Sequence, residues 1–260
     1  MHLKSFALAG ALIGALAGTH AASAASIIGL VDGKTLVWVD PATKKVTGEA
    51  DIKGAASVVG IDVRPADGML YALTADGGIY TVDAKSGQAT MKSKLSEQLK
   101  AGTTVTIDFN PVADRLRVIT SDGTNLRINV DDGKATVDGS LKFKEGDANA
   151  GKTPMVVAGA YTNSANPKPT ATALYDIDAT TGSLVSQAPP NDGILNTIGS
   201  LGIKLDGPVA FNIVVKGEDN AAWLVTGGAL YTVDLKTGKA TAAGNLEGVT
   251  GKLTDIAWVD

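Results

Sequence analysis

The arginines are the residues whose types and spacing point most directly to chemistry in this 260-residue chain. Arg115 and Arg117 are two positions apart, so on a strand they project from the same face, and Arg127 falls where the next strand should run. Guanidinium groups that converge can bind a carboxylate, a sulfate or an acidic sugar through paired hydrogen bonds. The competing interpretation is structural, with ion pairs from these arginines to Asp108, Asp114 or Asp122.

Oxygen-bearing side chains form the second group of candidates. Asp147 with Asn149, and Asn191 with Asp192, could contribute to a Ca²⁺ site, because hard cations take carboxylate and amide oxygens. No segment has the spacing of an EF-hand loop. Ca²⁺ is therefore the one cofactor that the residue composition suits, and no other cofactor is expected.

Two residue types are missing from the chain that would remain after export. There is no cysteine, and both histidines, His2 and His20, lie near the N-terminus. Ser-His-Asp catalysis, thiolate nucleophiles and zinc sites built on sulfur therefore have no residues to use. This favours a non-catalytic binding protein. A divalent-metal-dependent hydrolase of lactonase type is the enzymatic alternative, and a repeat-built structural component is a third.

One segment has the residue pattern of a phosphate-binding loop, but the residues on either side do not fit such a loop. Residues 146–153 fit the pattern G-x-x-x-x-G-K-[ST]. A functional loop follows a buried apolar strand and opens a helix, whereas Lys142 to Glu145 precede this segment and Pro154 with β-branched residues follows it. Nucleotide binding is not expected.

The N-terminal segment has the features of a secretory signal. Lys4 precedes an apolar run, and Ala22-Ser23-Ala24 provides small residues for cleavage. We expect a signal peptide over residues 1–24 and one domain over residues 25–260, in the periplasm or outside the cell. The net charge of −4 and the absence of a basic stripe argue against nucleic acid. We expect a monomeric domain that does not insert into a membrane. Its expected partner is a small molecule, a glycan or a protein.

Internal repeats indicate the architecture that must position these residues. Residues 79–90 and 230–241 nearly duplicate each other, and weaker copies surround Asp40, Asp131 and Asp178. Each copy predicts a strand, a turn in which Asp accepts a backbone N–H and Gly takes a left-handed conformation, and a second strand. The copy at Asp40 has Lys44 where the others have Gly. A short helical turn capped by Ser96 is also expected.

A second recurring element precedes the first. Residues 60–65 and 106–111 each predict a strand ending in a proline turn, and residues 254–259 resemble them without a following unit. The opening stretch, residues 27–47, conversely lacks its first strand. The sequence thus predicts an all-β propeller of five blades, each of four antiparallel strands, closed by pairing of the N- and C-terminal segments. Six blades or an open β-solenoid are the alternatives.

Several motifs are similar to those of the bacterial domain of unknown function 4394. They lie at residues 108–117, 125–127, 147–151, 160–163 and 189–196. Asn129-Val130-Asp131 departs from the family pattern, which has Asn and Pro after the third strand. The resemblance implies an exported, propeller-like domain with no assigned activity. Its motifs crowd into the third and fourth blades, where we place the predicted ligand site: Arg115, Arg117, Arg127, Asp147, Asn149, Tyr161, Asn163, Asn191 and Asn196.

Overall fold

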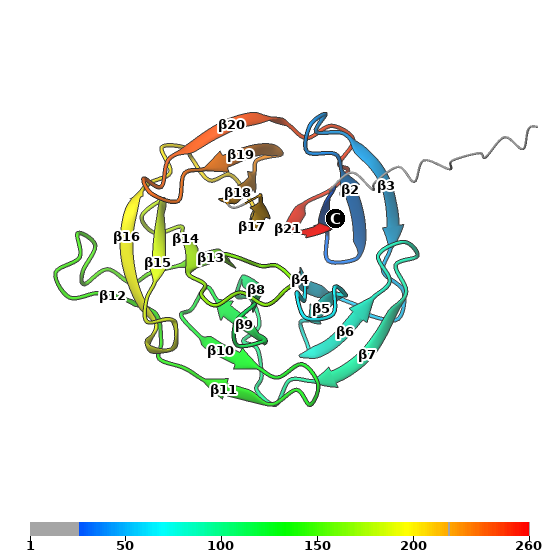
Figure 1. Ribbon diagram of the computed structural model, residues 1–260, viewed down its shortest axis with the longest axis horizontal. Coiled ribbons are helices and arrows are strands. Elements are labelled where there is room, and N and C mark those ends of the chain that lie inside the picture. The colour runs from blue at the N-terminus through cyan, green and yellow to red at the C-terminus, as the bar shows by residue number, and fades with distance from the viewer. Residues whose placement is uncertain (1–25, 218, 260) are drawn as a thin grey trace, which may run out of the picture.

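Five antiparallel sheets form a ring around a central axis (Figure 1). The computed structural model describes residues 26–217 and 219–259, so the predicted signal peptide lies outside the described residues. Within these ranges, no helix has the length and apolar character needed to cross a membrane. The five-bladed prediction is confirmed, and the six-bladed ring and the open solenoid are wrong.

Each blade runs from an inner strand at the axis to an outer strand at the rim. Blade 1 contains β21 (Leu253–Val259), β1 (Ser26–Val31), β2 (Thr35–Val39) and β3 (Val46–Asp51). Blade 2 contains β4 (Val58–Val63), β5 (Leu70–Thr74), β6 (Gly78–Val82) and β7 (Ala89–Lys94). Blade 3 contains β8 (Val105–Asn110), β9 (Arg115–Thr120), β10 (Asn125–Ile128) and β11 (Ala135–Val137).

The fourth blade is the irregular one. It contains β13 (Val156–Tyr161), β14 (Leu174–Asp178), β15 (Ser183–Gln187) and β16 (Ile194–Ser200), with a short 3₁₀ helix, η1 (Pro190–Asp192), before β16. A fifth strand, β12 (Lys142–Phe143), pairs in parallel with β16. Blade 5 contains β17 (Val209–Lys216), β18 (Asp219–Thr226), β19 (Ala229–Val233) and β20 (Ala240–Asn245).

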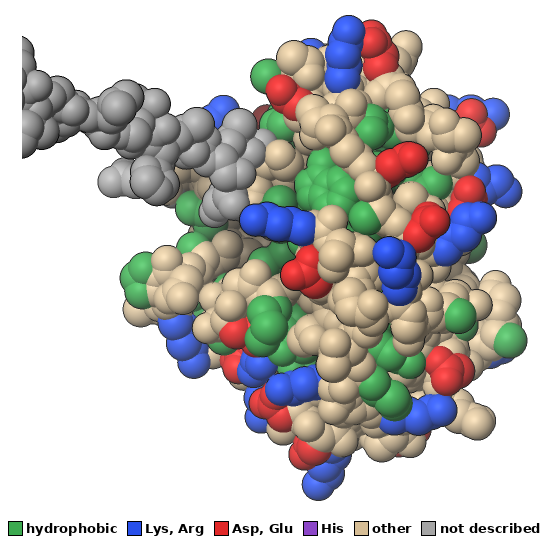
Figure 2. Space-filling view, turned by 90° about the vertical axis from the view of Figure 1, so that its right-hand side faces the viewer, with side chains coloured by type: hydrophobic (Ala, Val, Ile, Leu, Met, Phe, Trp, Pro, Cys, Tyr) green, Lys and Arg blue, Asp and Glu red, His purple; other side chains and the backbone are tan. Residues whose placement is uncertain are grey.

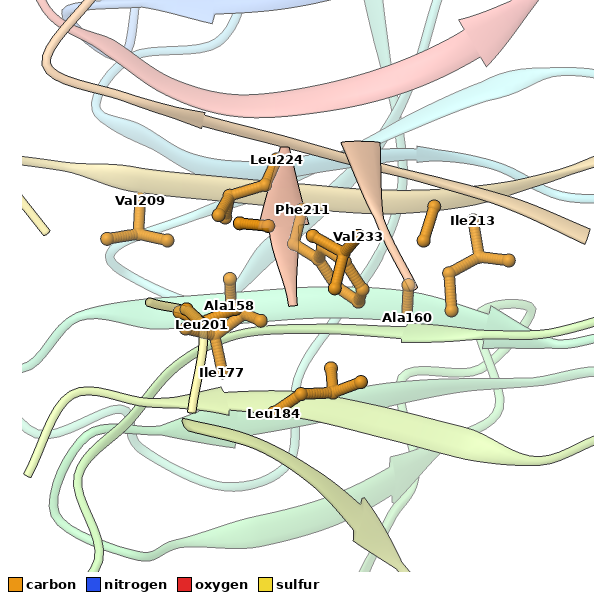
Figure 3. Close-up of a cluster of buried hydrophobic side chains, with 12 residues drawn as sticks. Ala158, Ala160, Ile177, Leu184, Leu201, Val209, Phe211, Ile213, Leu224 and Val233 are labelled. Atoms are coloured by element: carbon orange, nitrogen blue, oxygen red, sulfur yellow. The ribbon is translucent and has the colours of Figure 1, made fainter. Parts of the chain in front are cut away.

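The hydrophobic core lies between neighbouring blades rather than at one centre. Between blades 4 and 5, Ile177 and Leu184 face Phe211 and Leu224, all buried (Figure 3). Inner strands are covered on both faces by adjacent sheets, so β4 and β5 are almost entirely buried, whereas β3 alternates between half-buried and exposed positions. On the side of the molecule in Figure 2, acidic and basic side chains are interspersed, and no basic face gathers there.

Pairing of the two chain ends closes the ring. β1 runs antiparallel to β21, with Ile28 opposite Ala257 and Leu30 opposite Asp255. The C-terminal strand therefore supplies the inner strand of a blade whose other three strands come from the N-terminal residues. This confirms the predicted closure and leaves neither end with an open sheet edge at this position.

The predicted Asp turns are present in the repeat copies. The Asp83 and Asp234 carboxylates each accept hydrogen bonds from the backbone N–H groups two and three residues later. Asp40 does the same, and Lys44 takes the left-handed conformation, with φ of 62°, at the place that Gly87 and Gly238 occupy in their turns. The turn geometry therefore survives the loss of glycine in blade 1, at a cost in backbone strain.

Two sequence assignments are wrong in blade 3 and beside it. The turn residue equivalent to Asp83 is Asn129, not Asp131, because Asn129 accepts from Gly133 N–H through its carbonyl and from Asp131 N–H through its side chain. Ser96 begins no helical turn. Its backbone N–H donates to the Gly133 carbonyl and its hydroxyl accepts from Ala135 N–H, so interaction with blade 3 replaces local capping.

The corrected turn can be tested by paired substitutions. Asn129→Ala should lower the free energy of unfolding by about 1 kcal/mol, because it removes the side-chain acceptor of the turn. Asp131→Ala should cost less than about 0.5 kcal/mol, because this half-exposed carboxylate makes surface ion pairs with Lys92 and Arg64. Urea unfolding of both variants measures the difference, and a larger loss for Asp131→Ala would contradict the assignment.

Candidate functional site

Three buried carboxylates link the inner strands around the central channel. Asp255 accepts a hydrogen bond from Ile61 N–H at 2.9 Å, and Asp62 accepts one from Phe109 N–H at 2.7 Å. Asp108 accepts one from Tyr161 N–H at 2.9 Å. Each bond joins the inner strand of one blade to that of the next, from blade 1 through blade 4. The carboxylates thus satisfy backbone donors on the strand edges that face the axis.

Burial governs how these carboxyl groups titrate. It raises the pKa of Asp62 to about 7, against the lowering effect of hydrogen bonds from Phe109, Val63 and Asn212. The pKa of Asp108 is raised well above its usual range by burial and by the nearby charge of Asp62, and that of Asp255 by burial above all. The channel centre therefore holds protons at pH values where exposed carboxylates have lost theirs.

A fourth acidic group lies between blades 3 and 4. Asp176 is fully buried, and neither of its carboxylate oxygens accepts a hydrogen bond from the residues that the structure describes. Burial raises its pKa to about 8, and the positive charge of Arg117 opposes this shift. Gly159 leaves the space that Asp176 fills, since a Cβ there would lie 2.3 Å from Asp176 Oδ1. Glycine is thus required at this position by close approach.

A cavity of about 390 Å³, which we call the channel mouth, opens where the inner strands end at one end of the central axis. Asp62 and Asn212, each less than a tenth exposed, provide its deep polar groups. Trp258 and Val259 of β21 line it from blade 1, and the loop after β13 reaches it with Ser164, Ala165 and Asn166. The cavity therefore combines a buried carboxyl and an amide with an indole and backbone from four blades.

The loop that carries Ser164 is fixed to blade 5 by a pair of amides. Asn163 N–H donates to Asn220 Oδ1 at 2.7 Å, and Asn220 Nδ2 donates to Asn163 Oδ1 at 2.8 Å. Asn163 has φ of 59°, so the chain reverses direction there. Asn163 thus acts as a positioning residue for one wall of the cavity.

Four of the residues predicted to bind a ligand do come together: Arg117, Arg127, Tyr161 and Asn191. Their side chains bind one another and Asp138. The Arg117 side chain is 3% exposed and donates to Tyr161 Oη at 3.1 Å and to Asn191 Oδ1 at 2.8 Å. It also donates to Asp138, which Arg127 contacts with two further hydrogen bonds. This network joins blade 3 to η1 of blade 4. The ion-pair partner is Asp138 and not one of the three carboxylates named from sequence.

The other five predicted residues occupy separate places. Arg115 is exposed and donates to the Asp114 carbonyl. Asp147 accepts from Thr197 N–H at 2.7 Å, and Asn149 donates to the Thr197 hydroxyl at 3.0 Å, so the two dock their loop on β16. Asn196 donates to the Ala188 carbonyl. None of the nine predicted residues lines the channel-mouth cavity. Their binding of a ligand stays a prediction.

The remaining sequence motif forms no phosphate loop. Residues 146–153 make a series of turns without a helix, and Lys152 donates to Asn149 Oδ1. Among residues 26–217 and 219–259, no three acidic or histidine side chains are grouped so that they could hold a metal ion.

Sequence reasoning missed Asp62, Asn212 and Trp258. The signal that could have found the first and last was the second recurring element, because residues 60–65 and 254–259 form inner strands. Polar side chains on an inner strand can point only toward the axis or toward an adjacent blade. Asn212 lies in a strand without that motif, so no pattern marked it.

Comparison with known proteins places the chain by fold and family. A family model described as "Domain of unknown function (DUF4394)" matches residues 26–257. No curated protein matches the sequence. A protein of unknown function from Bacteroides thetaiotaomicron VPI-5482 is similar in structure, with a TM-score of 0.52 at 17% identity over 88% of this chain and 63% of that chain.

Two further solved structures are similar over most of this chain. A chain of a nidogen/laminin complex gives a TM-score of 0.53 at 10% identity, over 91% of this chain and 98% of that chain. An auxiliary nutrient binding protein from Bacteroides ovatus ATCC 8483 gives 0.45 at 13% identity, over 76% and 55%. At such identities the likeness shows the fold alone.

The buried carboxyls predict a pH dependence of stability. Their pKa values are raised in the folded state, so the folded protein binds more protons than the unfolded chain between about pH 4 and pH 8. Stability should therefore fall as pH rises from 5 to 8.5, by about 1.4 kcal/mol per pH unit for each of these carboxyls that is protonated in the folded protein and ionised in the unfolded chain. Urea unfolding across this range measures the slope.

A matched pair of variants assigns that slope. Asp108→Asn keeps an oxygen for Tyr161 N–H and cannot ionise, so it should reduce the slope and be more stable relative to the parent at pH 8.5 than at pH 5. Asp132→Asn, at an exposed turn, should leave the slope unchanged. Equal slopes for the parent and Asp108→Asn would contradict the role given to this carboxyl.

The arginine network predicts a second stability effect. Arg117→Lys keeps the charge but cannot reach Tyr161, Asn125, Asp138 and Asn191 together, so it should cost about 2 kcal/mol of unfolding free energy. Arg115→Lys, at an exposed position, should stay within about 0.5 kcal/mol of the parent. Similar losses for both variants in urea unfolding would refute the structural role of Arg117.

Proposed function

Given that this chain belongs to the family described as domain of unknown function DUF4394, we propose that it is an exported, non-catalytic binding protein that takes a small polar ligand at the channel mouth. The proposal rests on the cavity of about 390 Å³, in which Asp62 and Asn212 lie at the buried end and Trp258 forms part of the wall. Concave sites with a few converging polar groups are the usual form of small-molecule sites.

The scaffold supports binding because the cavity walls are held in place. Asp62 is fixed by Phe109 N–H, and the Asn163–Asn220 amide pair fixes the loop of Ser164 and Asn166. A preformed site loses little conformational entropy when a ligand enters. The export component of the proposal comes from the signal-like residues 1–24.

The lining favours binding over hydrolysis. Asp62 is the one acidic residue among the described residues that line the mouth, and it already accepts a backbone hydrogen bond. A second carboxyl or a histidine, needed for general acid–base chemistry or for a metal-bound nucleophile, does not line it. The lactonase-type alternative therefore has no observation at this mouth to favour it.

A cavity-filling variant tests the site. Ala165 is half-buried on the loop that lines the cavity, so Ala165→Trp should occupy the space that a ligand needs. Thermal-shift screening of sugars, amino acids, carboxylates and amines, followed by titration calorimetry of each hit, should give at least one ligand of the parent protein. Its Kd should rise by at least about tenfold in Ala165→Trp.

Ala150→Trp provides the matched control. Ala150 is exposed on the loop before β13 and does not line the cavity, so its replacement should leave Kd unchanged. The proposal fails if no compound binds, or if every hit binds Ala165→Trp as tightly as it binds the parent.

A further inference from the structure

A second cavity continues from the mouth along the surface of blade 5 and blade 1. It has a volume of about 320 Å³, and its lining is mainly apolar, with Trp223, Val215 and Ala221 from blade 5 and Pro41 from the β2–β3 turn. Trp258 and Val214 line both this cavity and the polar mouth. A ligand longer than one ring could therefore pass from the polar cavity onto the apolar one without leaving the protein surface.

Two indoles line the second cavity, and one of them, Trp258, also lines the polar mouth. The Trp223 and Trp258 rings are stacked, with centroids 6.1 Å apart and planes 21° from parallel. Both side chains are half-buried, so part of each ring remains accessible. Because each ring covers one face of the other, the accessible parts are the outer faces and edges, and the Trp258 ring lies beside the carboxyl and amide of the mouth.

The charges at the mouth narrow the class of ligand. No lysine or arginine is among the described residues that line the polar cavity, which disfavours a carboxylate or a phosphate there. The Asp62 carboxyl is buried, accepts from Phe109 N–H and interacts with Asn212, so it is poorly placed to balance a cationic ligand. A neutral ligand is the one whose charge matches the lining of the polar cavity, and the second cavity has one charged side chain, Lys216.

A neutral ligand that suits both cavities must be polar at its edge and apolar on its face. Sugar rings have this form, since hydroxyl groups at the rim both donate and accept hydrogen bonds while C–H groups cover the ring faces. The amide of Asn212 offers donors and an acceptor, and the hydroxyl of Ser164, whose O–H donates to the Tyr161 carbonyl, offers an acceptor. An indole packs flat against an apolar ring face.

We propose that the ligand of this site is a neutral oligosaccharide, with one sugar unit in the mouth beside Asn212 and the next stacked on the Trp223–Trp258 surface. This inference rests on the proposed function, since it gives a ligand class to the same mouth. It adds a second subsite and a requirement for at least two linked sugar units.

The probes are cellobiose, maltose, lactose and chitobiose with their trisaccharides, the matching monosaccharides, glucuronate and choline. Tryptophan fluorescence and titration calorimetry should show a neutral disaccharide or trisaccharide that binds at least about tenfold more tightly than its monosaccharide. Neither glucuronate nor choline should compete with it. Tighter binding of either charged probe would overturn the saccharide assignment.

Single substitutions locate the two subsites. Trp258→Phe, Trp223→Phe and Asn212→Ala should each raise the Kd of the bound oligosaccharide by at least about fivefold. Trp258→Phe keeps an aromatic ring on a strand that closes the propeller, and its folding is checked by its urea midpoint. Trp38→Phe is the matched control, because Trp38 is half-buried in blade 1 and lines neither cavity, so Kd should not change.

The outcomes separate this inference from the function on which it rests. If choline, glucuronate or another compound binds the parent and is excluded by Ala165→Trp while no neutral saccharide binds, the mouth is a binding site and the saccharide inference is wrong. If a saccharide binds with a Kd that Trp223→Phe and Trp258→Phe leave unchanged, the aromatic subsite is wrong. If nothing binds, both proposals fail together.

Discussion

The inner edge of each inner strand sets the constraint on which this propeller depends. An inner strand pairs with its blade on one side, and on the other its backbone N–H groups face the axis, where no further strand follows. Asp255, Asp62 and Asp108 satisfy donors of the next blade, and Thr106 Oγ accepts from Gly159 N–H in the same way. The acidic channel is thus explained by backbone satisfaction before any ligand is considered.

The use of buried carboxyl groups as acceptors for strand-edge N–H groups also affects how these groups titrate. Carboxyl groups buried in this way have raised pKa values, and each of the three already accepts a backbone hydrogen bond from the next blade. At the mouth, Asp62 and Asn212 are the deep polar groups of the cavity. The same residues that hold blades together therefore give the open end of the channel its polarity, and the stacked indoles give it an apolar neighbour.

The family motifs acquire a structural explanation from the network around Arg117. The resemblance lay at residues 108–117, 125–127, 147–151, 160–163 and 189–196. Four residues of these motifs, Arg117, Arg127, Tyr161 and Asn191, meet in one buried polar cluster with Asp138. A buried guanidinium without its partners is costly, so the loss of any one of these side chains should destabilise the cluster. The motif residues lie in neighbouring segments of the chain, and they dock blade 3 on blade 4.

Local pattern was sufficient to predict the strands, the Asp turns, the five blades and the closure of the ring, because strand alternation and turn chemistry act over a few residues and repeat along the chain. The sequence also identified residues of the Arg117 cluster, though not that they face one another. The turn of blade 3 was assigned to Asp131, although its local hydrogen bonds centre on Asn129. Ser96 was given a local cap, because the sequence did not reveal its contacts with blade 3. The cavity at the mouth could not be predicted from sequence because its residues also meet only between blades. Asp62, Asn212 and Trp258 come from three blades separated by long stretches of chain, and only the closed ring brings them to one cavity.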